Sequence, residues 1–252
     1  KNNLVIISSY SGNTEETISA FHEALARKLP LITITAGGKL LELTQKHKIP
    51  YIQIPKVYDN PRFAIGYSIK ATLKAMGEES ILNNLNGLFK LLDIDYYEAV
   101  GKELAEKLRA KVPLIYSSGR NAGLARYWKI SFNENAKIPA FYNFLPELNH
   151  NEIIGFVNSS ESNKLNHNFA FVFLKDPDDN LHTQKRITAT KKLLEDGGFE
   201  VLFADAAGPS LWHKSFSGII IAMWVSYYLA EHYGVDPEDV SMLEDFKKSL
   251  VL

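Results

Sequence analysis

Short apolar runs alternate with longer stretches of helical periodicity along most of the chain. The apolar runs predict buried strands at residues 4–9, 29–35, 51–55, 112–118, 138–144, 167–174 and 200–206. Runs that are apolar without alternation are typical of strands buried on both faces of a parallel sheet. Helical patterning fills residues 14–28, 39–48, 62–110, 121–135, 150–157, 181–197, 213–233 and 240–250. The alternation predicts βαβ units, and therefore an α/β fold with mainly parallel sheets.

The alternation occurs twice, and a helical stretch separates the two runs. Residues 62–110 are helical in pattern, with a break at 76–80, and strands resume at residue 112. We therefore expect two similar subdomains, residues 1–110 with linking helices and residues 111–235, followed by a helical tail at 236–252. The first run shows only three strands, so this subdomain is either small or lacks an opening βα unit before Lys1.

Composition narrows the class of protein. The chain has 252 residues, a hydrophobic fraction of 46% and a net charge of −1, which indicates a globular protein without a basic field for nucleic acid. Its longest apolar run, residues 218–230, suits a buried helix and is shorter than the roughly 18 residues of a membrane span. The absence of cysteine excludes disulfides and thiolate metal sites, and it fits a cytoplasmic enzyme.

A cluster of hydroxyls lies between the first predicted strand and the first predicted helix, in SSYSGNTEE at residues 8–16. In open α/β sheets ligands bind beyond the carboxyl ends of the strands, where a helix N-terminus offers N–H groups to a phosphate. Ser9, Ser11 and Thr14 can add hydroxyl donors, and Gly12 permits a tight turn. The motif is neither GxxxxGK[ST] nor GxGxxG, so it does not indicate nucleotide binding.

An ordinary helix start explains the same residues. Ser, Thr and Asn favour helix caps, and Asn13 and Glu16 have the spacing of a capping box. The loop by itself therefore leaves both phosphate binding and helix capping open.

A second polar cluster lies between apolar segments at residues 127–156. It contains Asn133, Glu134, Asn135, Glu147, Asn149, His150, Asn151 and Glu152. A carboxylate such as Glu134 and an imidazole such as His150 can divide proton-transfer work between them. Structural alternatives remain open, because Glu134 can pair with Lys129 or Lys137 and His150 can cap a helix through Asn149. The spacing around His150 matches no recognised metal-ligand motif such as HExxH.

Several motifs, taken in order, resemble one family. The segments SSYSGNTEET, ITAGGKL, PRFAIGYS and FNENAKIPAF…PELNHNEIIGF resemble the bifunctional phosphoglucose/phosphomannose isomerases, which are built from sugar isomerase (SIS) domains. The resemblance continues to MLEDFKKSL near the C-terminus and so covers nearly the whole chain. The first motif marks SIS domains in general, whereas NENAK together with PELNHNE is more specific to the isomerases.

The resemblance implies two flavodoxin-like, three-layer αβα SIS subdomains, the first without its N-terminal βα unit. It implies a cytoplasmic homodimer that interconverts glucose 6-phosphate or mannose 6-phosphate with fructose 6-phosphate through a shared cis-enediol. Such an enzyme serves glycolysis and gluconeogenesis, needs neither metal nor cofactor, and has no nucleic acid or membrane partner.

The resemblance also implies roles for residues of the two clusters. Ser9, Ser11 and Thr14 would hold the substrate phosphate. Glu134 would shuttle a proton between C2 and C1 of the sugar. We expect partial burial beside aromatic residues such as Phe132 and Phe141 to make this carboxylate a stronger base.

Three further residues receive roles in the same way. His150 would open the sugar ring, and in the family this histidine often comes from the neighbouring subunit. Arg62 would stabilise the enediolate oxygen, although without the resemblance it reads as a surface residue at a helix start. Lys247 would assist at the ring or hydroxyl end of the substrate, with Lys248 adjacent to it.

A non-catalytic phosphosugar-binding SIS protein, acting as a sensor or regulator, is the alternative. It would share the hydroxyl cluster, so that cluster cannot separate the two functions. The second cluster does separate them, because a sensor has no need for Glu134 and His150 together.

Overall fold

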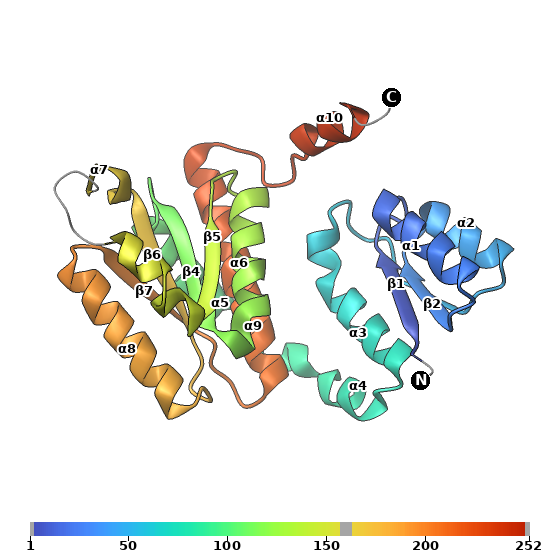
Figure 1. Cartoon of the computed structure of the whole chain (residues 1–252), viewed down its shortest axis with the longest axis horizontal. Coiled ribbons are helices and arrows are strands. Elements are labelled where there is room, and N and C mark those ends of the chain that lie inside the picture. The colour runs from blue at the N-terminus through green and yellow to red at the C-terminus, as the bar shows by residue number, and fades with distance from the viewer. Residues whose placement is uncertain (1–2, 157–162, 250–252) are drawn as a thin grey trace. The chain divides into compact units, whose positions relative to one another are not determined.

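The structure is a computed structural model that describes residues 3–156 and 163–249. The chain forms two compact units, unit 1 at Lys1–Gly87 and unit 2 at Leu88–Leu252 (Figure 1). Each unit contains one sheet, and every described strand pair in it is parallel. The predicted α/β fold with parallel sheets is therefore confirmed.

Unit 1 alternates strands and helices as the periodicity predicts. Its elements are β1 (Val5–Ser9), α1 (Glu15–Ala26), β2 (Leu31–Thr35), α2 (Gly38–Lys46), β3 (Tyr51–Gln53), the 3-10 helix η1 (Pro61–Ala64), α3 (Ile65–Met76) and α4 (Glu79–Leu85). The strand order is β1-β2-β3, and helices cover both faces of the sheet (Figure 1). On one face Ile7 belongs to a buried cluster with Phe21 of α1 and Leu40 of α2. On the other face Ile34 packs with Ala71 of α3.

Unit 2 is a larger three-layer structure. Its elements are η2 (Leu88–Lys90), α5 (Ile94–Lys107), β4 (Val112–Ser118), η3 (Gly119–Asn121), α6 (Ala122–Glu134), β5 (Phe141–Leu145), η4 (Glu147–Asn149), η5 (Glu152–Phe156), α7 (Asn163–Asn166), β6 (Phe169–Lys175), α8 (Leu181–Asp196), β7 (Glu200–Asp205), α9 (Leu211–Tyr233) and α10 (Ser241–Ser249). The strand order is β5-β4-β6-β7. Figure 1 shows α8 on one face of this sheet and α6 and α9 on the other.

Alternate residues of the unit 2 strands fill two separate cores. Tyr116 and Phe173 belong to the cluster on the α8 side, with Ile187 of that helix. Ile115 and Val172, one position away, belong to the cluster formed with α5, α6 and α9. Burial on both faces explains why these strands read as continuous apolar runs in the sequence.

The predicted elements agree with the structure apart from one helix. The seven predicted strands are present within a few residues of their predicted ends. The break predicted at residues 76–80 separates α3 from α4, where Gly77 ends α3 in the left-handed conformation. The helix predicted at 150–157 is wrong in type, because residues 152–156 form a 3-10 helix, and residue 157 lies outside the described residues.

The compact units divide the chain after Gly87, whereas the predicted subdomains meet between residues 110 and 111. The segment between these points includes α5, which packs closely on α9. A Cβ added to Gly101 of α5 would lie only 2.4 Å from the Cβ of Trp224 on α9. The division into SIS subdomains at 1–110 and 111–235, with a tail at 236–252, stays a prediction. In the described part of the chain, no helix combines the length and apolarity needed to cross a membrane.

A buried ion pair connects the end of β6 to α9. The Nζ of Lys214 lies 2.7 Å from Asp176 Oδ1 and 2.5 Å from Asp178 Oδ2, and the Lys214 and Asp176 side chains are 5% and 1% exposed. Asp176 also accepts hydrogen bonds from the backbone N–H of Asp178 at 3.0 Å and from Asn121 Nδ2 at 3.1 Å. Burial alone would raise the pKa of Asp176, but the Lys214 ammonium and these donors hold it below its usual value.

Lys214→Met should destabilise unit 2 by about 3 kcal/mol at neutral pH, because it leaves the Asp176 carboxylate buried without its counter-ion. Since the folded pKa of Asp176 is lowered, the pair stabilises the protein above the unfolded pKa of about 3.9. That stability is lost as the pH falls through the folded pKa, so the difference between wild type and variant should shrink in acid. Urea unfolding followed by Trp fluorescence measures this, because all three Trp residues lie in unit 2.

Lys191→Met is the matched control, because it removes a lysine that is only partly buried, with its side chain 34% exposed, from an ion pair with Glu195 on α8. We expect it to change the free energy of unfolding by less than about 1 kcal/mol. The role of the buried pair would be contradicted if both variants lost the same free energy of unfolding. It would also be contradicted if Lys214→Met lowered that free energy equally at neutral and acidic pH.

Candidate functional site

The hydroxyl loop, residues 9–14, connects β1 to α1 in unit 1. Ser9 is 8% exposed, and its Oγ lies 2.9 Å from Thr14 Oγ1, so the two hydroxyls share a hydrogen bond across the loop. The backbone N–H of Gly12 donates to Ser9 Oγ at 3.1 Å, and that of Asn13 donates to Ser11 Oγ at 3.2 Å. Ser9, Ser11 and Thr14 therefore lie in one compact turn at the carboxyl end of β1.

Two glycines let the hydroxyl loop interlock with the turn that follows β2. Gly12 has a φ of +72°, and an added Cβ would lie 1.8 Å from the carbonyl oxygen of Gly37. Gly38 has a φ of +69°, and its Cβ would lie 2.3 Å from the carbonyl oxygen of Ser11. The backbone N–H of Leu40 donates to the carbonyl oxygen of Gly12 at 2.9 Å. Each loop thus fixes the backbone of the other at an approach that only glycine permits.

The capping box predicted at Asn13 and Glu16 is wrong. Thr14 is the N-cap of α1, and among the described residues no side chain accepts a cap hydrogen bond there. The Oδ1 of Asn13 accepts instead from the backbone N–H of Lys39, at 3.0 Å, in the first turn of α2. The first N–H groups of α1 therefore remain available to an anion, which the helix dipole also favours at this end.

Arg62 lies on η1 in the same unit, partly buried, with its Cζ 4.8 Å from the centroid of the Phe63 ring. The sequence interpretation missed Tyr10, which ties the chain before η1 to the hydroxyl loop. The Tyr10 hydroxyl donates to the carbonyl oxygen of Tyr58 at 2.9 Å and accepts from its N–H at 3.2 Å. Tyr58 in turn contacts the ring of Phe63. These contacts connect Arg62 to the loop. The only sequence signal for them was the position of Tyr10 inside the SSYSGNTEE motif.

Glu134 is the last residue of α6 in unit 2, and its side chain is exposed. The predicted partial burial beside Phe132 and Phe141 is wrong for the described chain, because Phe132 is itself in the core and Phe141 is 53% exposed. The Nζ of Lys137 donates to the carbonyl oxygens of Glu134 and Asp239, the latter at 2.7 Å. Lys137 therefore connects the end of α6 to the segment before α10.

The amides beside Glu134 serve the local fold. Asn133 Nδ2 donates to the carbonyl oxygen of Ile138 at 2.9 Å. Asn135 is 3% exposed, and its Nδ2 donates to Ser226 Oγ on α9 at 2.8 Å. Some polar side chains of this segment therefore have a structural role. They stabilise the turn that carries the exposed Glu134.

His150 directly follows η4 and is exposed. Among the described residues, none makes a hydrogen bond, ion pair or ring contact with its imidazole. The structural alternative was a helix cap through Asn149, but Asn149 Nδ2 donates to Thr190 Oγ1 at 2.8 Å. His150 instead ends η4 through its backbone N–H, which donates to the carbonyl oxygen of Glu147 at 2.9 Å. An exposed imidazole of this kind can exchange protons with a ligand.

Lys247 lies on α10, where its Nζ is 2.7 Å from Glu244 Oε1. Lys248 makes the equivalent contact with Asp245 at 3.0 Å. Both lysines are exposed and paired one helical turn back, so their local geometry does not distinguish them. The role predicted for Lys247 stays a prediction.

The predicted residues thus form two groups. The hydroxyl loop and Arg62 lie in unit 1 and suit an anion, whereas Glu134, His150 and Lys247 lie in unit 2 and suit proton transfer. Over residues 3–156 and 163–249, no three His, Cys, Asp or Glu side chains are grouped so as to hold a metal ion.

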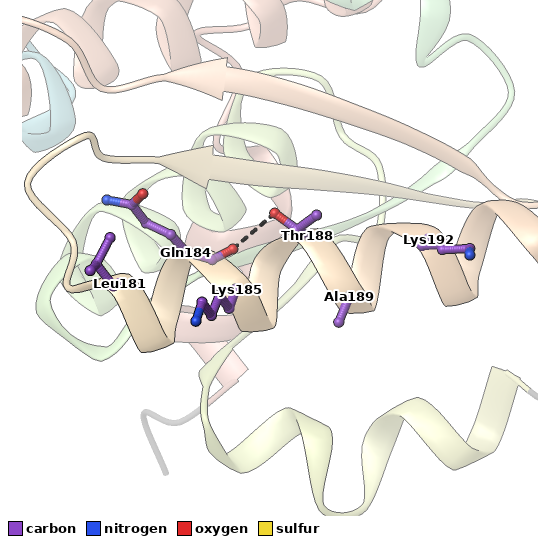
Figure 2. Close-up of a pocket in the computed structure, with 6 residues that line it drawn as sticks. All are labelled: Leu181, Gln184, Lys185, Thr188, Ala189 and Lys192. Carbon is purple, nitrogen blue, oxygen red and sulfur yellow. Dashed lines mark hydrogen bonds between the residues drawn. The ribbon is translucent and has the colours of Figure 1, made fainter.

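A shallow hollow of about 400 Å³ lies on the outer face of α8, and no residue of either group lines it. Figure 2 shows its lining, which comes from this helix: Leu181, Gln184, Lys185, Thr188, Ala189 and Lys192. The hydroxyl of Thr188 donates to the carbonyl oxygen of Gln184 at 3.0 Å (Figure 2). The lining offers neither a carboxylate nor an imidazole, so the hollow does not suit proton-transfer chemistry.

The chain is similar to known proteins both in sequence and in fold. Residues 98–250 match the family described as bacterial phospho-glucose isomerase C-terminal SIS domain. The chain is 35% identical over 256 residues to the bifunctional phosphoglucose/phosphomannose isomerase of Aquifex aeolicus, and 36% identical over 261 residues to that of Caldicellulosiruptor bescii. Both alignments cover 98% of this chain and 76% of the relative. In fold, the chain resembles a glucose-6-phosphate isomerase-like protein from Thermus thermophilus, with a TM-score of 0.62 and 19% identity over 98% of this chain and 86% of that one.

Gly12→Ala should destabilise unit 1 by about 2–4 kcal/mol, because the new Cβ must displace the carbonyl of Gly37 and the positive φ is strained. Gly77→Ala is the control, since Gly77 has a φ of +75° but open space around its Cβ position, and it should cost about 1 kcal/mol. Hydrogen exchange of peptides covering β1 and β2 measures both changes. Equal losses in the two variants would show that the interlocked loops add nothing beyond backbone strain.

Proposed function

The chain belongs to the family of bifunctional phosphoglucose/phosphomannose isomerases, and from this membership we propose that it interconverts glucose 6-phosphate with fructose 6-phosphate through a cis-enediol, with mannose 6-phosphate as a second candidate substrate. The observation that carries the proposal is 35% identity to the Aquifex aeolicus relative across 98% of the chain. The non-catalytic sensor gains no support from the similarities. We place the activity in glycolysis and gluconeogenesis, in the cytoplasm.

The hydroxyl loop supports the phosphate part of this proposal. Ser9, Ser11 and Thr14 gather three hydroxyls beside the uncapped first turn of α1. A sugar phosphate oxygen can accept from these hydroxyls and from the first N–H groups of the helix. Binding then relies on directed hydrogen bonds at a fixed backbone, which the interlocked glycine turns hold in place.

Proton transfer between C2 and C1 is assigned to Glu134. Its carboxylate removes the C2 proton of the open-chain aldose, and the electrons of that bond move to give an enediolate with the negative charge on O1. Return of the proton to C1, with transfer of the hydroxyl proton from O2 to O1, gives the ketose. The Arg62 guanidinium stays charged throughout and is assigned to the enediolate oxygen, where it stabilises the developing charge.

The remaining roles depend on assembly. We infer a homodimer in which His150 opens the ring of a sugar bound to the neighbouring subunit, and Lys247 assists at the ring or hydroxyl end. The support from the structure is that the imidazole of His150 is exposed and makes no hydrogen bond, ion pair or ring contact with the described residues of its own chain. A histidine that serves another subunit needs that exposure.

Incubation of fructose 6-phosphate with the protein in D2O, followed by NMR, should show deuterium at C1 together with glucose 6-phosphate. Glu134→Gln should lower kcat by at least about 100-fold while the Kd for fructose 6-phosphate changes little, because the shape is kept and the base is lost. Glu106→Gln, which removes an exposed carboxylate paired with Arg109, is the control and should leave turnover unchanged. Binding without deuterium uptake by the wild type would overturn the isomerase proposal.

Mixing two inactive variants tests the assignment of His150 to the neighbouring subunit. A heterodimer of Glu134→Gln and His150→Ala subunits contains one site with both substitutions and one intact site. After subunit exchange, an equimolar mixture should recover about a quarter of the wild-type activity, because about half of the dimers are mixed and each has one intact site. If His150 acted within its own chain, both sites of every dimer would stay inactive and no recovery would occur.

A further inference from the structure

The segment that carries His150, residues 146–152, is anchored to the fold on the side that precedes the histidine. Leu148 is fully buried in the cluster between the unit 2 sheet and α8. The Nδ2 of Asn149 donates to Thr190 Oγ1 at 2.8 Å, and Thr190 on α8 is 2% exposed. The backbone just before the imidazole therefore has an apolar anchor and a buried hydrogen bond.

Glu152 anchors the same segment on the other side of His150. The hydroxyl of Tyr116 donates to Glu152 Oε1 at 2.6 Å, and Asn143 Nδ2 donates to Glu152 Oε2. Tyr116 on β4 and Asn143 on β5 are partners in the parallel register, so their side chains leave the same face of the sheet next to each other. Both oxygens of the carboxylate are thus bonded to the sheet.

Tyr116 is a rigid donor for this contact. It is 1% exposed, and its ring lies 5.4 Å from that of Phe171 and 5.5 Å from that of Phe173, centroid to centroid. Burial, together with the hydrogen bond to the Glu152 carboxylate, raises the pKa of Tyr116, so its hydroxyl stays protonated and keeps donating. The contact therefore does not switch off across the physiological pH range.

We propose that Tyr116 and Glu152 are positioning residues that aim the imidazole of His150 at the ring oxygen of the sugar phosphate. The proposal rests on the proposed function, in which His150 opens the ring. Every other polar side chain of residues 146–152 is bonded within the chain, namely those of Glu147, Asn149, Asn151 and Glu152. These bonds restrict the backbone of the segment, and His150 is the polar side chain that they leave for a ligand.

Geometry explains why such anchoring matters to ring opening. A general acid must lie within hydrogen-bond reach of the atom that it protonates, and a misplacement of about 1 Å can cost about 100-fold in rate. His150 is two residues from Glu152, so release of Glu152 from the sheet moves the backbone that carries the imidazole. The Glu134 base is on another element, α6, and does not depend on this contact.

Tyr116→Phe tests the proposal, because it removes one hydroxyl and keeps the ring in its aromatic cluster. We expect kcat on fructose 6-phosphate to fall about tenfold with KM within about twofold of the wild type. The 5-deoxy analogue of fructose 6-phosphate lacks the hydroxyl that closes the furanose ring and needs no ring opening. Deuterium exchange at C1 of this analogue should therefore be unchanged in the variant.

Tyr228→Phe is the matched control, because the hydroxyl of Tyr228 also donates to a carboxylate, Glu98 Oε1, at 2.6 Å. It should leave turnover of both sugars unchanged. The positioning role would be overturned if Tyr116→Phe lowered the rates on fructose 6-phosphate and on the 5-deoxy analogue equally. It would also be overturned if Tyr116→Phe had the same rates as the control. An inactive wild type would instead overturn the proposed function, so the two failures are distinguishable.

A double-variant comparison gives an independent readout. In a His150→Ala background, Tyr116→Phe should cause no further loss on fructose 6-phosphate, because the group that it positions is already absent. Glu152→Gln keeps an acceptor for the Tyr116 hydroxyl and should retain more activity than Glu152→Ala. Additive losses with His150→Ala would show that Tyr116 acts on the whole fold and not through His150.

Discussion

Parallel strand pairing is the constraint on which the rest of this protein depends, because it brings the carboxyl ends of all strands in a sheet to one edge. In unit 1 the register sets Ser9 opposite Thr35, so the loops after β1 and β2 meet and interlock through Gly12 and Gly38. In unit 2 the register sets Ser118 opposite Leu145, which brings residues 146–152 to the edge where β4 ends. The hydroxyl loop and His150 both follow from this placement, whereas Glu134 ends α6, just before the amino end of β5.

The two units use the same edge in different ways. In unit 1 the hydroxyls bond to one another and to backbone N–H groups, and the first turn of α1 stays uncapped.

In unit 2 the equivalent hydroxyls are used internally, since Ser117 donates to a backbone carbonyl and Ser118 accepts from Asn121. Asn121 also donates to Asp176, which connects these hydroxyls to the buried pair with Lys214. A buried ion pair must be fully satisfied to be tolerated, and such a network leaves few donors for a phosphate. The edge of unit 1 is therefore the better anion site.

In two short segments of unit 2, hydrogen-bonded side chains flank an exposed acid or base. Asn133 and Asn135 hold the turn after α6, and Glu134 between them is exposed. Asn149 and Glu152 hold the next segment, and His150 between them is exposed. The polar side chains of both motifs thus serve two purposes at once, because a side chain that is hydrogen-bonded within the fold also limits the motion of the neighbouring acid or base.

The sequence by itself determined the order and type of nearly all elements, since apolar periodicity and turn residues such as Gly77 act locally. It also indicated the hydroxyl loop and the two exposed groups, Glu134 and His150. Only the tertiary structure decided the partners of the surrounding side chains. Asn13 accepts from α2 instead of capping α1, Tyr10 holds a segment 48 residues away, and Tyr116 reaches Glu152 across 36 residues. These contacts arise from strand register and helix packing, which bring distant residues together and which no local pattern encodes.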